Sequence, residues 1–142
     1  MRAYIFQSMP DRFDLSVKLS PQSADAWYAT RYRTKMNPGD IVFFWMGGDP
    51  KFRGLYGWGT IQSLPYFKKE WNAWAVDIKY DVKFANHIRY EVLLKDHILR
   101  EMLIFRVKIG TNFLLDDKQL KSLIGLISNM NQTIPNIYQN GN

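Results

Sequence analysis

The sequence contains no cysteine and only two histidines, and these shortages exclude several kinds of chemistry. Without cysteine there is no disulfide, no thiolate-bound metal and no cysteine nucleophile. The histidines, His87 and His97, belong to no HExxH motif and to no other pattern of metal ligands. We therefore expect no metal and no cofactor, and side-chain packing must supply the stability of the fold.

Long apolar runs and catalytic motifs are also missing. No stretch approaches the roughly 20 apolar residues of a membrane-spanning helix, and the first residues lack the apolar core of a signal peptide. We therefore expect a cytoplasmic protein that does not bind membranes. The sequence has neither a G-x-S-x-G nucleophile motif nor a phosphate-binding GxxxxGK[ST] loop. We expect the chain not to be an enzyme.

Positive charge and aromatic side chains, by contrast, are abundant. The formal net charge is +6, the pI is about 9.5 and aromatic residues make up 15% of the chain. Cationic surfaces attract polyanions through counterion release, and exposed rings offer surfaces on which bases stack. A second interpretation is that the rings fill the core while the charge aids solubility. Composition favours neither interpretation over the other.

The pattern of apolar residues predicts one α+β domain over residues 1–130, followed by a polar C-terminal tail over 131–142. We expect five short strands, at residues 3–7, 41–45, 55–61, 76–84 and 103–107, few enough to close into a small barrel. Residues 76–84 alternate most clearly between apolar and charged side chains. Helices are expected at 23–33 and 117–130, with one or two short helical turns within 87–100, where Asp96 is a candidate cap.

Five short motifs occur in order along the chain, and together they are more specific than any one of them. With these motifs the sequence resembles the EVE domain family of the PUA-like superfamily over roughly residues 2–128. Met9 departs from the pattern, because the family often has Asn there. The motifs are Gln7-Ser8 with Pro10, Trp27-x-x-x-Arg31-Tyr32-Arg33, Pro38-Gly39-Asp40-x-Val42-Phe43-Phe44-Trp45, Gly57-Trp58-Gly59 and Gly110-Thr111-Asn112-Phe113.

The resemblance implies a PUA-like fold, a small and strongly curved β-barrel of about five to six strands flanked by helices. It places a pocket between the end of the first strand, the helix after it and the late Gly-Thr-Asn-Phe motif. Relatives in the superfamily, including YTH domains and the DNA-reading domains of restriction systems, read modified bases. The implied function is a reader that holds a methylated or hydroxymethylated base, flipped or single-stranded, in an aromatic pocket. Its partner would be DNA or RNA, with a separate effector protein as a further candidate.

The resemblance also suggests roles for individual residues. Ring walls would come from Trp27 and Trp45, with Phe6 or Phe13 as a further wall. Trp45 ends an apolar strand and is equally compatible with the core. Arg31 is favoured over Arg33, because on a helix it would share the face of Trp27. The remaining base-binding residues are Ser8, Thr111 and Asn112, and the phosphate contacts are Arg12, Arg31, Arg33 and Arg106.

Two other functions remain open at this point. Some PUA-like relatives of the ASCH type are hydrolases of modified nucleosides, and such an enzyme would need a Lys or Glu base beside the hydroxyl of Ser8 or Thr111. The sequence places no such residue clearly. A ligand-binding or protein-interaction module would instead expose an apolar patch, and the net charge of +6 argues against it. The sequence does not distinguish DNA from RNA.

Overall fold

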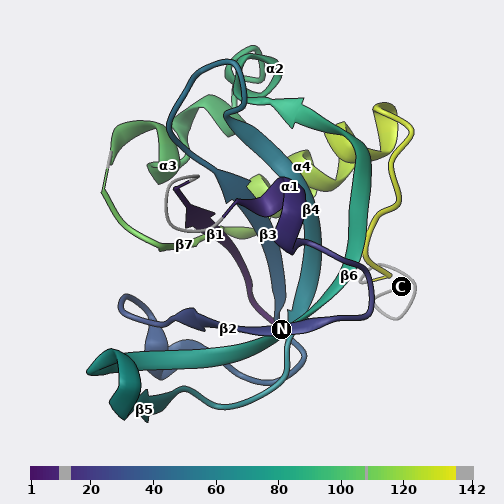
Figure 1. The fold of residues 1–142 in the computed structure, drawn as a ribbon. Helices are drawn as coiled ribbons and strands as arrows, with labels where there is room; N and C mark the ends of the chain where they lie inside the picture. Colours follow the sequence, from purple (N-terminus) through teal and green to yellow (C-terminus); the bar gives the residue numbers. More distant parts are fainter. Residues whose placement is uncertain (10–13, 108, 137–142) are drawn as a thin grey trace.

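A curved sheet runs through the whole molecule. The computed structural model describes residues 1–9, 14–107 and 109–136. The strands lie in the order β2-β6-β4-β3-β1-β7, and β5 pairs with β6 (Figure 1). The β1–β3 pair is parallel and the other pairs are antiparallel. The strands are β1 (Ala3–Ser8), β2 (Ala24–Tyr28), β3 (Ile41–Met46), β4 (Gly54–Ile61), β5 (Tyr66–Lys68), β6 (Ala73–Arg89) and β7 (Asn112–Leu114).

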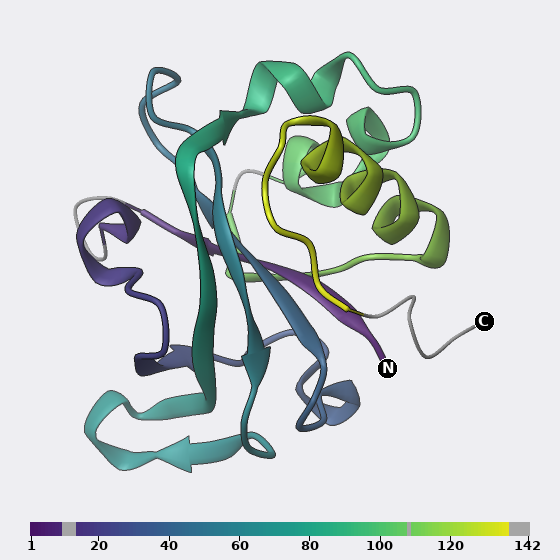
Figure 2. The same ribbon diagram turned by 90° about the vertical axis from the view of Figure 1, so that its right-hand side faces the viewer.

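Short helices cover both faces of this sheet. Figure 2 shows α2, α3 and α4 on one side and α1 on the other. The longest helix, α4, begins with a capping box in which Asp116 and Gln119 satisfy each other's backbone N–H groups. The helices are α1 (Leu15–Lys18), α2 (Tyr90–Leu94), α3 (Leu103–Arg106) and α4 (Asp117–Asn129), with 3-10 turns η1 (Arg33–Lys35), η2 (Lys69–Trp71) and η3 (Leu99–Glu101).

Alternation along the strands divides the apolar side chains into two cores. Ile5 and Phe43 point to the side of α2, α3 and α4, where they pack with residues such as Leu123. Phe6 and Phe44 point to the opposite side and pack with Leu15 and Leu19 beside α1. We call these sides the helix face and the α1 face. Because neighbouring residues of a strand lie on opposite faces, a binding site on one face cannot use both.

The buried amide of Asn112 joins the two edges of the sheet. The edge strands are β2 and β7. Asn112 Nδ2 donates to the Tyr28 carbonyl at 2.9 Å, and its Oδ1 accepts from the Thr30 N–H at 2.9 Å and from the Thr30 hydroxyl at 3.3 Å. The side chain is fully buried. One amide therefore closes the curved sheet where no strand ladder does.

Glycines allow the middle of the sheet to bend. A Cβ atom at Gly57 would lie 2.1 Å from the Val82 carbonyl oxygen, and one at Gly59 would lie 2.0 Å from that of Lys79. No other residue fits so close to a neighbouring backbone. The register between β4 and β6 shifts at both places, as expected where a strand bends.

Several sequence predictions are confirmed. Strands occupy the predicted positions at 3–7, 41–45, 55–61 and 76–84, and the helix predicted at 117–130 is α4. Asp96 accepts hydrogen bonds from the Ile98 and Leu99 N–H groups, and η3 follows it. The α+β class and the strongly curved sheet flanked by helices are confirmed as well.

Two predicted elements are wrong. The helix predicted at 23–33 is strand β2 followed by a turn, because this segment pairs with β6 and buries Trp27 against its neighbours. The strand predicted at 103–107 is helix α3, which packs Ile104 into the helix face. The three-residue strands β5 and β7 were not predicted from the sequence.

Residues 131–136, the described part of the expected tail over 131–142, make contacts with the sheet. The Trp58 Nε1 donates to the Thr133 carbonyl at 2.9 Å, and Ile134 packs against the helix face. The Ala85 N–H donates to the Gln132 side chain at 3.3 Å. As far as residue 136, where the described region ends, the segment therefore folds back over β4 and β6.

Candidate nucleic-acid interface

The end of β1 carries a buried hydroxyl without a partner. Ser8 is 6% exposed, and its Oγ makes no hydrogen bond. Alternation along β1 places Ser8 on the α1 face, together with Phe6 and Tyr4. The Tyr4 hydroxyl is also unpartnered, and burial, followed by the Asp40 charge, raises the Tyr4 pKa to about 12. Buried polar groups nearly always have partners, so two such groups on one face call for an explanation.

Trp27 lies on the same face and is held in one orientation. Its ring packs against Phe6 and Phe44, with centroids 5.9 and 5.4 Å away. Its Nε1 donates to the Tyr80 hydroxyl at 3.0 Å, and that hydroxyl donates to Asp25 at 3.0 Å. Burial is the main cause that raises the pKa of Tyr80, so the phenol stays protonated and able to donate. Only 5% of Trp27 is exposed.

Trp45 does not share this face. It is 1% exposed and belongs to the core of the helix face, where its ring meets Phe105 of α3 edge-to-face at 5.6 Å. The prediction of two tryptophan walls around one pocket is therefore wrong. The cause is the period of two in a strand: Phe44 points toward Trp27, and the next residue must point away.

The predicted base contacts from the Gly-Thr-Asn-Phe segment change as well. The Asn112 side chain donates to the Tyr28 carbonyl and accepts from the Thr30 N–H, and these bonds close the sheet. Asn112 is therefore a structural residue here and not a free group for a base edge. Thr111 is half-buried, and its carbonyl accepts from the Gln7 N–H at 2.7 Å.

The four predicted phosphate contacts are spread over the molecule. Arg31 and Arg33 are exposed in the turn after β2, so the helical argument that favoured Arg31 is wrong. The Arg33 guanidinium lies 4.8 Å from the Trp74 ring. Arg106 is on α3, on the helix face, where it forms an ion pair with Glu101. Arg12, together with the predicted wall Phe13, lies outside the described residues.

Three residues beside Trp27 were missed from the sequence. They are Phe44, which packs on its ring, Tyr80, which accepts its N–H, and Asp25, which accepts from Tyr80. The alternation of 76–84 placed Tyr80 on an apolar face but did not reveal its hydroxyl's partners. Those partners depend on the pairing of β2 with β6, which was hidden because β2 was taken for a helix.

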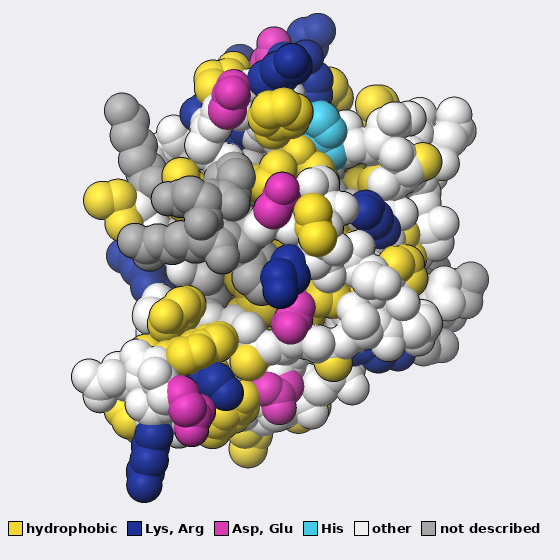
Figure 3. Space-filling view, in the orientation of Figure 1, with side chains coloured by type: hydrophobic (Ala, Val, Ile, Leu, Met, Phe, Trp, Pro, Cys, Tyr) yellow, Lys and Arg dark blue, Asp and Glu magenta, His cyan; other side chains and the backbone are white. Residues whose placement is uncertain are grey.

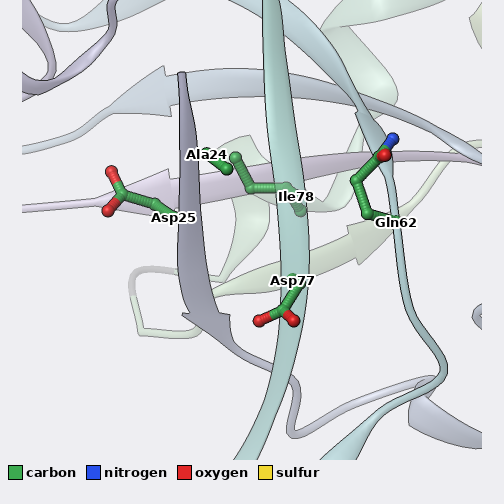
Figure 4. Close-up of a pocket in the computed structure, with 5 residues that line it drawn as sticks. All are labelled: Ala24, Asp25, Gln62, Asp77 and Ile78. Carbon is green, nitrogen blue, oxygen red and sulfur yellow. The ribbon is translucent and has the colours of Figure 1, made fainter. Parts of the chain in front are cut away.

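An open depression of about 450 Å³ is lined by residues from the start of β2, from β6 and from the segment after β4. Figure 4 shows the carboxylates of Asp25 and Asp77 beside Ala24, Gln62 and Ile78. Asp25 accepts a hydrogen bond from Tyr80, and Asp77 accepts one from Tyr66 at 2.6 Å. That bond is the largest of the causes that raise the Tyr66 pKa to about 12. Two carboxylates repel phosphate, so this depression does not suit nucleic acid.

The charged side chains do not form one continuous cationic patch on the face shown in Figure 3. Lys and Arg occur there in separate groups, with acidic and hydrophobic side chains between them. Some cations are already paired, as Lys68 is with Glu70 at 3.4 Å and Lys79 with Asp81 at 3.3 Å. On this face the positive charge is therefore divided among separate cations.

The described part of the chain offers little for catalysis. It contains no group of three or more acidic or histidine side chains placed to hold a metal. Ser8 Oγ is bonded to no general base. His87 stacks on Tyr56 with ring centroids 4.7 Å apart, and burial is the main cause that lowers its pKa.

Among the residues that the structure describes, no helix combines the length and apolar character needed to span a bilayer.

The family model of the EVE domain matches residues 2–125. The chain belongs to the EVE domain family. This EVE domain also resembles solved structures. A protein from Agrobacterium tumefaciens has a TM-score of 0.75 at 13% identity, with 95% of this chain and 97% of that chain covered. A hypothetical protein from Leishmania major has a TM-score of 0.74 at 16% identity, with 93% and 98% covered.

Human THYN1 is a third similar structure. It was solved in complex with DNA that contains 5-methylcytosine, and its TM-score to this EVE domain is 0.70 at 17% identity, with 95% of this chain and 100% of that chain covered. No curated protein matches the sequence. At these identities the solved structures establish the fold that the motifs imply.

Proposed function

We propose that this EVE domain binds nucleic acid and holds a modified base against the α1 face at the end of β1. The observation that carries the proposal is the buried, unpartnered hydroxyl of Ser8 on the same face as Trp27. A hydroxyl in such a place gains a hydrogen bond when a ligand with a polar edge arrives. The DNA complex of human THYN1, a protein of similar fold, supports DNA as the first candidate.

The aromatic contacts limit where the base can lie. A base sandwiched between two rings would separate them by two van der Waals contact distances of about 3.5 Å each. The rings around Trp27 are closer, with centroids at 5.4 and 5.9 Å. Because Trp27 is 5% exposed, the base reaches its ring only when the residues that cover it shift.

We assign three roles to the described residues. Trp27 is the stacking wall, held by Tyr80, and Phe6 supports its ring. Ser8 bonds the edge of the base. Arg31 and Arg33, exposed in the turn after β2, contact phosphate. In this proposal the chemistry ends at binding, and any action on the nucleic acid falls to a separate effector protein. A methylated cytosine in DNA is the first ligand to test, and modified RNA is the second.

The test separates binding from folding through Ser8. Binding of fluorescent oligonucleotides would be measured for unmodified, 5-methylcytosine, 5-hydroxymethylcytosine and N6-methyladenine sequences, as DNA and as RNA. We expect a preference for one modified base, which Ser8→Ala reduces about fivefold, the value of one hydrogen bond. Since Ser8 Oγ has no protein partner, the same variant keeps its free energy of unfolding.

The control is Ser128→Ala, an exposed serine of α4 on the other side of the sheet, which should change neither property. Trp27→Phe keeps a ring in the core and should lower affinity for the modified base more than for the unmodified one. Equal binding of all oligonucleotides by the wild-type protein would overturn the proposal.

A further inference from the structure

One stripe of β6 on the α1 face emerges from the core and ends in an exposed aromatic pair. Val76 and Ile78 are fully buried, whereas Trp74, two residues before Val76 on the same face, is 38% exposed. Phe67 of β5 is paired with Trp74 in the ladder and is 48% exposed. The two rings meet edge-to-face, with centroids 6.0 Å apart. Large apolar side chains exposed together mark a contact surface more often than isolated ones do.

A cation completes this surface. The turn after β2 is tied to β6 by a hydrogen bond from the Ala29 N–H to the Trp74 carbonyl, at 3.0 Å. It carries Arg33 over the Trp74 ring, 4.8 Å from its centroid. Within the described part of the chain, no carboxylate forms an ion pair with Arg33. Its charge is thus available to a phosphate, and its position is fixed by the ring beneath it.

We propose that Phe67, Trp74 and Arg33 form a stacking platform for a nucleotide next to the modified base. An apolar protein partner would leave the Arg33 charge unpaired. A nucleotide satisfies both parts of the surface, because its base stacks on the rings and its phosphate pairs with the guanidinium. Trp74 and Trp27 lie on the same face, since Trp27 is paired with Val76. The proposal extends the proposed function, on which its choice of ligand rests.

Binding of single-stranded oligonucleotides to variants tests the platform, with the fold of each variant checked by circular dichroism. We expect Trp74→Ala to weaken binding about tenfold for modified and unmodified strands alike, leaving their ratio unchanged. Trp74→Phe, which keeps an aromatic face, should retain most of the affinity. Arg33→Ala should lower the slope of log affinity against log salt by about 0.7, the value for one phosphate of a single strand.

Phe52 provides a matched control. It is 45% exposed, and the Lys51 ammonium lies 5.6 Å from its ring, so it repeats the pairing of a ring with a cation. It belongs to the loop between β3 and β4, which lies at the opposite end of the molecule from β5 in both ribbon views (Figures 1 and 2). Phe52→Ala should bind as the wild type does.

Three results would overturn the platform. They are unchanged binding by folded Trp74→Ala, an equal loss in Phe52→Ala, or a loss confined to the modified strand, which would assign Trp74 to the base pocket. Failure of the proposed function would look different. Wild-type protein would then show no preference for a modified base, while Trp74→Ala would still lose affinity for every strand.

Discussion

The hydrogen bonds of Trp27 explain why this ring can serve as a fixed wall. Its Nε1 donates to Tyr80, and Tyr80 donates to Asp25 at the surface. A bound base gains most when the ring it meets is already in place, because no side-chain ordering is then required. Tyr80 is therefore expected to act on binding through the position of Trp27.

Tyr80→Phe removes the acceptor of the Trp27 N–H and the donor to Asp25. We expect the free energy of unfolding to fall by about 1–3 kcal/mol, since a buried donor loses its partner. Denaturation with urea measures this loss. Tyr66→Phe is the control, because its bond to Asp77 lies nearer the surface. A stability loss as large for Tyr66→Phe as for Tyr80→Phe would contradict this account.

His87 predicts a dependence of stability on pH. Burial lowers its pKa below the usual value, the Arg89 charge lowers it further, and a backbone hydrogen bond at Lys51 opposes the shift. The unfolded chain therefore binds a proton more readily than the folded one, so stability falls as the pH drops below about 6.5. Substituting His87→Phe, which keeps a ring against Tyr56, should flatten the stability profile between about pH 7 and 5. Parallel profiles for the two proteins would contradict the expectation.

At the scale of elements, the closure of the sheet by Asn112 is the feature most sensitive to a single substitution. Its side chain, at the start of β7, forms hydrogen bonds with the end of β2 and with the turn after it. Asn112→Ala leaves the Tyr28 carbonyl and the Thr30 N–H without their hydrogen-bond partner. We expect the free energy of unfolding to fall by about 2–4 kcal/mol. Faster amide exchange at Thr30 would show where the change begins. Thr30→Ala, which removes only the 3.3 Å bond, should cost less than about 1 kcal/mol.

The sequence predicted those elements whose own side chains carry a regular pattern. The alternation of 76–84 and the three- and four-residue spacing of α4 are local, and both are confirmed. β2 was missed because Ala24, Asp25 and Ala26 are poor strand formers, and its partner β6 lies far away in sequence. The fold class was also predicted from the family motifs, because a family resemblance implies the arrangement of all the strands and helices together.

The candidate site was predicted less completely than the fold, for a reason that Trp45 and Asn112 illustrate. A motif shows which residues occur together, but the face of a residue depends on strand register and its free hydrogen bonds depend on its neighbours. Trp45 points to the other core, and the amide of Asn112 is used in closing the sheet. The placement of Ser8 and Trp27 on one face agrees with the prediction; their contact with a base stays a prediction.

At the scale of the molecule, the sheet separates a supporting core from a candidate binding face. Trp45→Ala should therefore lower the free energy of unfolding by about 3–5 kcal/mol, because a large buried ring is lost. The protein that remains folded should keep the ratio of affinities for modified and unmodified oligonucleotides. A denaturation curve and a binding titration on the same sample test both statements. A changed ratio would show that the two faces are not independent.

The closure by Asn112 also determines how the barrel can change its width. A ladder between β2 and β7 would have to break along its whole length before the barrel could expand. Here the circumference is closed by the three hydrogen bonds of a single amide, while every strand keeps its own ladder. If the proposed function is correct, opening this one seam would let the interior on the α1 face adjust to the size of the base without unfolding any strand.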